Sequence, residues 1–209
     1  SEITLRGPDK STADYKTSLE RVREQSAHLA QLVDDLLFVA RAEAGMVRLQ
    51  RQTVNLASLL RDVCRDGTVL GRERGVQVDL RESVSDGSVV GDPGKLRQLL
   101  LILVDNAIRY SRPGGTVAVD LNRAPGGLAI RVRDEGVGIP PEEIETIFER
   151  FYRGANAPPH HDEGSGLGLP VAKAIVEAHG GEIRVESELD HGTVVTVILP
   201  ASGKLKAIA

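Results

Sequence analysis

The sequence has a single cysteine, no long apolar run and no block of basic residues, and each of these absences argues against one class of protein. The single cysteine, Cys64, excludes an internal disulfide and fits a reducing compartment. No apolar run approaches the ~20 residues that cross a bilayer, so this chain is expected to make no direct membrane contact. The formal net charge is −4 and the basic residues are scattered, which argues against nucleic acid as a partner.

Three short stretches, far apart in the chain, each suit one part of a nucleotide. Asn106 offers an amide oxygen, which a hard cation such as Mg²⁺ accepts as a ligand. Asp134 offers a carboxylate that can accept the adenine amino group. The glycine run 164–168 allows backbone N–H groups to approach phosphates, because no Cβ blocks them. Each stretch alone is weak evidence, but their order, with a helix pattern after the glycines, predicts a nucleotide site.

Hydrophobic spacing divides the chain near residue 46. Residues 15–45 are predicted to form one helix that ends at Gly45, because mostly apolar residues recur at alternating spacings of three and four. This seam consists of Leu19, Val22, Ser26, Leu29, Val33, Leu36 and Ala40. Two interpretations follow: the helix packs on its own domain, or it belongs to a hairpin that dimerises through the seam.

Residues 47–209 are predicted to be a mixture of short strands and helices. Strands are expected at 47–50, 76–80, 88–91, 116–123, 128–134, 182–188 and 193–199. Helices are expected at 56–70, 93–110, 141–149 and 167–179, with Asp92-Pro93 opening the second and Gly180 closing the last. Helices combined with runs of antiparallel strands predict an α+β fold, a two-layer sandwich with helices on one face of a sheet.

Taken in order, these motifs resemble the ATP-binding half of a bacterial sensor histidine kinase, of the superfamily shared with gyrase, Hsp90 and MutL. The match runs through the N box (101–111), the G1 box (134–138), the F box (147–153), the G2 box (164–169) and a closing Gly192-Thr193. The resemblance implies the GHKL (Bergerat) ATP-binding fold, with ATP and Mg²⁺ as cofactors. It also implies transfer of the ATP γ-phosphoryl group to a histidine, for relay to an aspartate of a response regulator.

The resemblance also implies which residues form the site. Asn106 is expected to hold Mg²⁺, and Arg109, on the same helix face, to contact phosphate in a bidentate manner. Tyr110 either stacks near the adenine or simply packs. The expected nucleotide-binding set is Asn106, Arg109, Tyr110, Asp134, Gly136, Gly138, Ile139, Arg153, Gly164, Ser165, Gly166, Leu167, Gly168, Leu169 and Thr193.

Two of these glycines, and a segment that begins within the F box, carry further expectations. Gly136 and Gly138 are expected to keep side chains out of the space of the adenine. Residues 149–166 have little apolar content and are expected to form a mobile lid over ATP. Arg150 is a second candidate, beside Arg153, for neutralising phosphate charge.

The chain departs from the family pattern in two places. The family's phosphoacceptor histidine, in a His-Glu-x-x-x-Pro-like context, is missing, and His28 lacks that context and is expected to be a bundle side chain. Residues 1–46 are therefore expected to be part of the dimerisation and phosphotransfer hairpin, and the chain alone should not phosphorylate itself. Ile102 replaces a polar residue four positions before Asn106, and it can neither ligate Mg²⁺ nor activate water.

The implied partners are a response regulator and a second copy of the chain, bound through the N-terminal helix. The parent protein is expected to be anchored in the inner membrane, with this part cytoplasmic. Ile102 leaves open a second class of function, a degenerate nucleotide-binding regulatory module without kinase activity. A mechanical ATPase like gyrase or Hsp90 is disfavoured, because the glutamate general base is missing and the F box is present.

Overall fold

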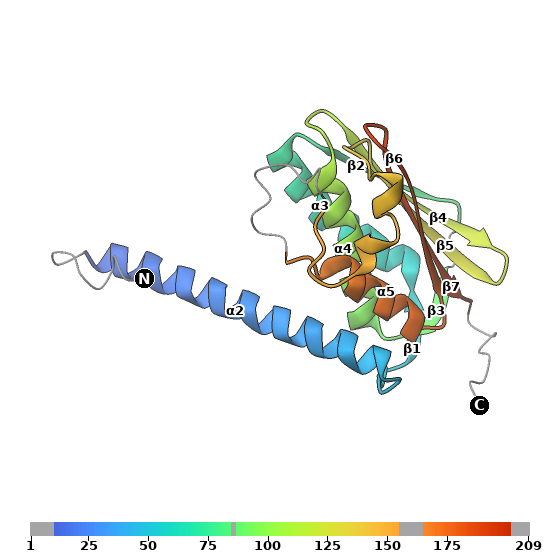
Figure 1. Ribbon diagram of the computed structural model, residues 1–209, viewed down its shortest axis with the longest axis horizontal. Helices are drawn as coiled ribbons and strands as arrows, with labels where there is room; N and C mark the ends of the chain where they lie inside the picture. Colours follow the sequence, from blue (N-terminus) through green and yellow to red (C-terminus); the bar gives the residue numbers. More distant parts are fainter. Residues whose placement is uncertain (1–10, 85–86, 155–164, 202–209) are drawn as a thin grey trace.

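The computed structural model describes residues 11–84, 87–154 and 165–201, and it shows a long helix attached to a two-layer α/β body (Figure 1). The helices are α2 (Thr12–Glu43), α3 (Leu56–Arg74), α4 (Pro93–Tyr110) and α5 (Gly168–Ala178), with the short 3₁₀ turns η1 (Pro141–Glu143) and η2 (Thr146–Phe148). The strands are β1 (Gln52–Asn55), β2 (Gln77–Glu82), β3 (Ser88–Gly91), β4 (Thr116–Ala124), β5 (Gly127–Arg133), β6 (Glu182–Glu188) and β7 (Gly192–Pro200). The predicted α+β fold is confirmed.

Five strands form the main sheet in the order β2-β4-β5-β7-β6. β2 runs parallel to β4, and the other neighbours are antiparallel. The helices α3, α4 and α5 cover one face of this sheet (Figure 1), and aliphatic side chains from both layers form the core. β1 and β3 pair in a separate two-stranded ladder. The strand order places the end of β5 beside the start of β7, where the candidate site lies.

The helix α4 carries the first group of candidate site residues, and local sequence sets where it starts. The Asp92 side chain accepts the Lys95 backbone N–H at 3.1 Å, and Pro93 occupies the first turn, as predicted. The residues that α4 buries are Leu96, Leu99, Leu100, Leu103, Val104, Ala107 and Ile108. Asn106 and Arg109 lie at the edge of this buried stripe and are half-buried, so their polar groups remain within reach of a ligand.

Two predicted elements are wrong. Residues 47–50 do not form a strand, and the Gln50 N–H donates to the Asp92 side chain at 3.0 Å instead of to a neighbouring strand; the first strand is β1. Residues 141–149 form the two 3₁₀ turns η1 and η2 instead of one helix. Within these described turns Ile147 alone is buried, so no continuous apolar stripe holds a longer helix together.

The helix α2 extends away from the body (Figure 1). Its predicted seam is exposed. Phe38 and Val39 are the residues that it buries in the described part of the chain. By contrast, Leu19 is 69% exposed and Leu29 is 62% exposed. The seam therefore does not pack on its own domain. No helix among the described residues is both long and apolar enough to span a membrane.

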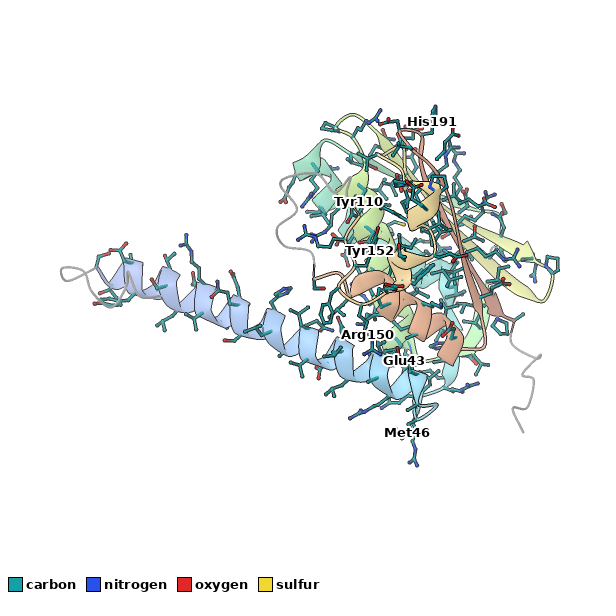
Figure 2. The ribbon with its side chains drawn as sticks, in the orientation of Figure 1. Glu43, Met46, Tyr110, Arg150, Tyr152 and His191 are labelled. Atoms are coloured by element: carbon teal, nitrogen blue, oxygen red, sulfur yellow. The ribbon has the colours of Figure 1, made fainter. Side chains whose placement is uncertain are left out.

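A different side of α2 attaches the helix to the body. The contacts are the hydrogen bond from Gln98 Nε2 to Asp35 Oδ1 (2.7 Å), the Lys95 ammonium over the Phe38 ring (4.2 Å) and the ion pair of Arg150 with Glu43 (Figure 2). Two of these contacts end on the first turns of α4, so the position of α2 is tied to the helix that carries Asn106.

Candidate nucleotide-binding site

The most distinctive group of the molecule is the carboxylate of Asp134, which directly follows β5 and is only 6% exposed. The backbone N–H groups of Gly136 and Thr193 donate to its Oδ1 at 2.9 and 3.2 Å. Among the described residues both donors bond to Oδ1, so Oδ2 is left to accept a hydrogen bond from a ligand. Burial raises the pKa of this carboxyl to about 6, against the lowering effect of the two N–H donors.

A cleft of about 870 Å³, part of it open to solvent, includes Asp134 in its wall. Most of the wall is apolar, and it includes Leu103, Ala107, Val132, Ile139, Ile147 and Val195. An apolar slot with one buried hydrogen-bond acceptor suits a flat ring that carries an amino group, as adenine does. We call this the apolar cleft.

A second cleft, of about 910 Å³, adjoins the first, and we call it the polar cleft. Both are lined by Asn106, Tyr110, Ile147, Tyr152, Arg153 and Leu169. The polar cleft is also lined by Arg109, Ser165, Gly166 and Gly168. In the described part of the chain no side chain caps the N-terminus of α5, so its first N–H groups can serve an anion. Two arginines and this helix end suit a phosphate chain.

The side chains that α4 delivers to the polar cleft are held by close neighbours. Arg109 Nε donates to Asp105 Oδ2 at 2.6 Å, one turn earlier on the helix, which directs the guanidinium along α4. Gly168 lies against the same helix: a Cβ there would be 3.3 Å from Ile102 Cγ2 and 3.8 Å from Asn106 Nδ2. Ile102 thus shares the side of Asn106, as predicted, and it places a methyl group where the family pattern has a polar one.

Gly136 and Gly138 also permit two close backbone contacts, beside the predicted task of keeping side chains out of the adenine space. A Cβ on Gly136 would lie 2.1 Å from the Tyr110 carbonyl oxygen, and a Cβ on Gly138 would lie 2.0 Å from that of Glu188. Gly138 also has φ +69°, which favours glycine. Both residues therefore permit close crossings of backbone segments, one with the end of α4 and one with the end of β6. These crossings hold the walls of the site at a fixed separation.

Most of the predicted site residues line the two clefts: Asn106, Arg109, Tyr110, Asp134, Gly138, Ile139, Arg153, Ser165, Gly166, Gly168, Leu169 and Thr193. Gly136 and Leu167 do not. Gly136 packs against the end of α4, and the Leu167 side chain, just ahead of α5, is buried with 3% exposure. Gly164 and most of the predicted lid lie outside the described residues. Arg150 pairs with Glu43 instead of lining either cleft (Figure 2).

Sequence reasoning missed much of the wall of the site. Tyr152 lines both clefts, and its place in the F box, beside Arg153, was the available signal. Val185 and Val195 line the apolar cleft without belonging to a motif, and Leu103 lines it from an N-box position to which no task was assigned. Their inward positions depend on the phase of α4 and on the register of β6 with β7, where Val185 lies opposite Val195. A single sequence does not contain that pairing.

A two-layer sandwich, a buried acid at a strand end and a polar cleft at a helix start together define a nucleotide-binding domain. Residues 91–203 match the family model described as histidine kinase-, DNA gyrase B-, and HSP90-like ATPase. The chain belongs to this family.

Curated relatives of the chain are named as sensor kinases. The chain is 35% identical over 201 residues to the sensor histidine kinase CusS of Escherichia coli O6:H1, which covers 96% of this chain and 41% of that protein. It is 34% identical over 198 residues to the sensor histidine kinase YkoH of Bacillus subtilis, which covers 94% of this chain and 42% of that protein. The chain thus spans about two fifths of the length of these relatives.

Solved structures show the same fold. Full-length ShkA in complex with AMPPNP superposes with a TM-score of 0.76 at 30% identity, over 95% of this chain and 42% of that one. The mycobacterial sensor histidine kinase MprB superposes with a TM-score of 0.64 at 32% identity, over 71% of this chain and 97% of that one.

Proposed function

We propose that this chain is the ATP-binding catalytic region of a sensor histidine kinase, joined at residues 46–47 to part of the dimerisation and phosphotransfer hairpin. It binds Mg-ATP and presents the γ-phosphoryl group to a histidine on a helix outside this chain. The group then passes to an aspartate of a response regulator. The observation that carries the proposal is the buried Asp134 carboxylate, with Oδ2 open to a ligand in an apolar cleft.

The residues of the two clefts have separate tasks in this function. Asp134 Oδ2 accepts the adenine amino group and so selects the base. Asn106 supplies one oxygen ligand to Mg²⁺, an ion that keeps several waters and binds phosphate oxygens. Arg109 and Arg153 offset the phosphate charge. Bound Mg-ATP supplies the reactive phosphoryl group, and transfer depends on positioning and charge neutralisation more than on covalent chemistry from this chain.

The exposed seam of α2 supports a homodimer, because a row of exposed leucine and valine side chains is costly to leave in water. The second copy would pair along the face that carries Leu19 and Leu29. A response regulator receiver domain is the proposed acceptor of the phosphoryl group. We place the chain on the cytoplasmic side of an inner-membrane-anchored parent.

Calorimetric titration with a non-hydrolysable ATP analogue, with and without Mg²⁺, tests the proposal first. Binding that strengthens when Mg²⁺ is present supports it. Absence of binding would contradict it and would favour a degenerate module whose motifs are a relic of ancestry. Phosphotransfer in trans, onto a longer chain that carries the acceptor helix, then distinguishes a kinase from a module that only binds nucleotide. This chain alone is expected to incorporate no phosphate.

Nucleotide affinity is expected to fall when the pH drops below about 6. The pKa of Asp134 is raised to about 6 in the nucleotide-free protein, so the carboxylate is ionised above that pH and protonated below it. Because two N–H donors occupy Oδ1, the proton resides on Oδ2, where it opposes the adenine amino group. Each pH unit below the pKa should cost about tenfold in affinity. Titrations between pH 5 and pH 8, with circular dichroism to confirm folding, measure this; equal affinity at both ends would contradict it.

Asparagine in place of Ile102 is expected to strengthen the Mg²⁺-dependent part of binding by about three- to tenfold. The amide would add an oxygen ligand on the same side of α4 as Asn106. Glutamate at this position should in addition raise uncoupled ATP hydrolysis, because a carboxylate can act as a general base for water. The measurements are the ratio of affinities with and without Mg²⁺, and the rate of phosphate release. Ile102→Leu is the control, and unchanged values in both variants would show that this position does not face the cation.

A further inference from the structure

One stripe of α2 faces the body, and this stripe extends as far as the polar cleft. His28, Gln31, Asp35, Phe38 and Ala42 recur at spacings of three and four, so they share one side of the helix. The stripe is held in place: Gln31 and Gln98 both donate to Asp35, at 2.8 and 2.7 Å, and Phe38 is buried. His28 lies two turns before Asp35 and lines the polar cleft.

This side of α2 is distinct from the seam proposed for dimerisation. Each residue advances ~100° around a helix, so Leu29, Val33 and Leu36 lie roughly opposite to Asp35 and Phe38. A partner chain along the seam would therefore leave His28 at the cleft. His28 itself is exposed, so its ring is accessible to a ligand.

The part of the site that His28 reaches is the phosphate half. It lines the polar cleft with Asn106, Arg109 and Ser165, and it is absent from the described lining of the apolar cleft that contains Asp134. An imidazole N–H can donate to a phosphate oxygen, and the ring can carry a positive charge near neutral pH. Ile102 lines the same cleft and has no polar group to offer.

We infer that α2 supplies a nucleotide-contacting residue, and that His28 contacts the outermost phosphate of a bound nucleoside triphosphate. The inference rests on the proposed function and deepens it. Its consequence is a preference for triphosphate over diphosphate that comes from the helical segment instead of from the ATP-binding body. The sequence alone indicated only an ordinary bundle side chain at this position.

The test is the substitution His28→Ala, with calorimetric titration of a non-hydrolysable ATP analogue and of ADP, both with Mg²⁺. Affinity for the analogue is expected to fall about tenfold, as for loss of one charge-assisted hydrogen bond, with ADP changed less than about twofold. His28→Gln keeps an N–H donor and should recover part of the loss. His191→Ala is the matched control, since His191 is an exposed histidine of the β6–β7 turn, at the end of the body opposite α2 (Figure 2).

A second measurement needs no variant that alters binding. The ring resonances of His28 should shift on addition of the ATP analogue and stay unchanged with ADP, while those of His191 respond to neither. Equal losses for both nucleotides in His28→Ala would show that the residue only places α2, and would overturn the inference. No loss, or acid-labile phosphate attached to His28, would overturn it too. If the wild-type protein binds neither nucleotide, both the proposed function and the inference about His28 fail.

Discussion

Asparagine in place of Asp134 is expected to lower the affinity for a non-hydrolysable ATP analogue by about a hundredfold or more. The two side chains have the same shape, so Gly136 and Thr193 can still donate to an oxygen at the Oδ1 position. The amide nitrogen then occupies the Oδ2 position and faces the adenine amino group, donor against donor. Loss of a charge-assisted hydrogen bond, with a buried donor left unpaired, costs about 3 kcal/mol, which corresponds to this factor. Calorimetric titration measures it.

The fold of this variant should remain intact. Burial opposes ionisation of Asp134, so a neutral amide in its place is expected to leave the free energy of unfolding equal to that of the wild type or above it at neutral pH. Asp190→Asn is a suitable control, because the Asp190 side chain is 70% exposed and pairs with Arg112 outside the clefts. Undiminished binding by the Asp134 variant would mean that the carboxylate does not bind the adenine amino group, and the proposed function would lose its main support.

Alanine in place of Gly138 is expected to destabilise the protein by more than about 3 kcal/mol and to abolish nucleotide binding. Two costs combine at this position. The left-handed backbone, with φ +69°, costs a residue with a Cβ about 1–2 kcal/mol. The Cβ would also lie 2.0 Å from the Glu188 carbonyl oxygen, and that backbone is held by the ladder between β6 and β7. Chemical denaturation measures the stability, and titration measures the binding.

Gly114→Ala separates these two costs. Gly114 has φ +86°, and a Cβ there would meet nothing within 4 Å, so this variant carries the conformational cost alone. We expect it to lose about 1–2 kcal/mol of stability and to bind nucleotide normally. Equal losses of stability in the two variants would show that the loop after β5 relaxes around the added methyl group. The cleft walls would then not be held at a fixed separation.

What could be predicted from the sequence is what depends on near neighbours in the chain. The cap at Asp92 needs only the N–H of Lys95, three residues on, and the end of α2 needs only a glycine at position 45. The motifs also identified Asn106 and Asp134, because each of these motifs is recognised by one side chain of a given kind at one position. The tasks assigned to these residues stay predictions until a nucleotide is titrated.

What could not be predicted depends on segments that meet only in the fold. The N–H of Thr193 reaches Asp134 across 59 positions, and this contact decides which carboxylate oxygen remains open. The partner of Arg150 lies 107 positions away, on α2, so an arginine within the F box looked like a phosphate ligand. Leu167 belongs to a glycine motif, yet its side chain is buried at the start of α5 and does not line either cleft.

The contact between Asp134 and Thr193 has a consequence for the order of folding. It joins the end of β5 to the start of β7, the last strand that the structure describes, so a nascent chain that has not yet added β7 cannot form the base site. Pairings between distant segments form slowly, because a long loop must close first. Nucleotide binding would therefore select completely folded molecules, and ATP at a thousand times its dissociation constant would add about 4 kcal/mol to their stability.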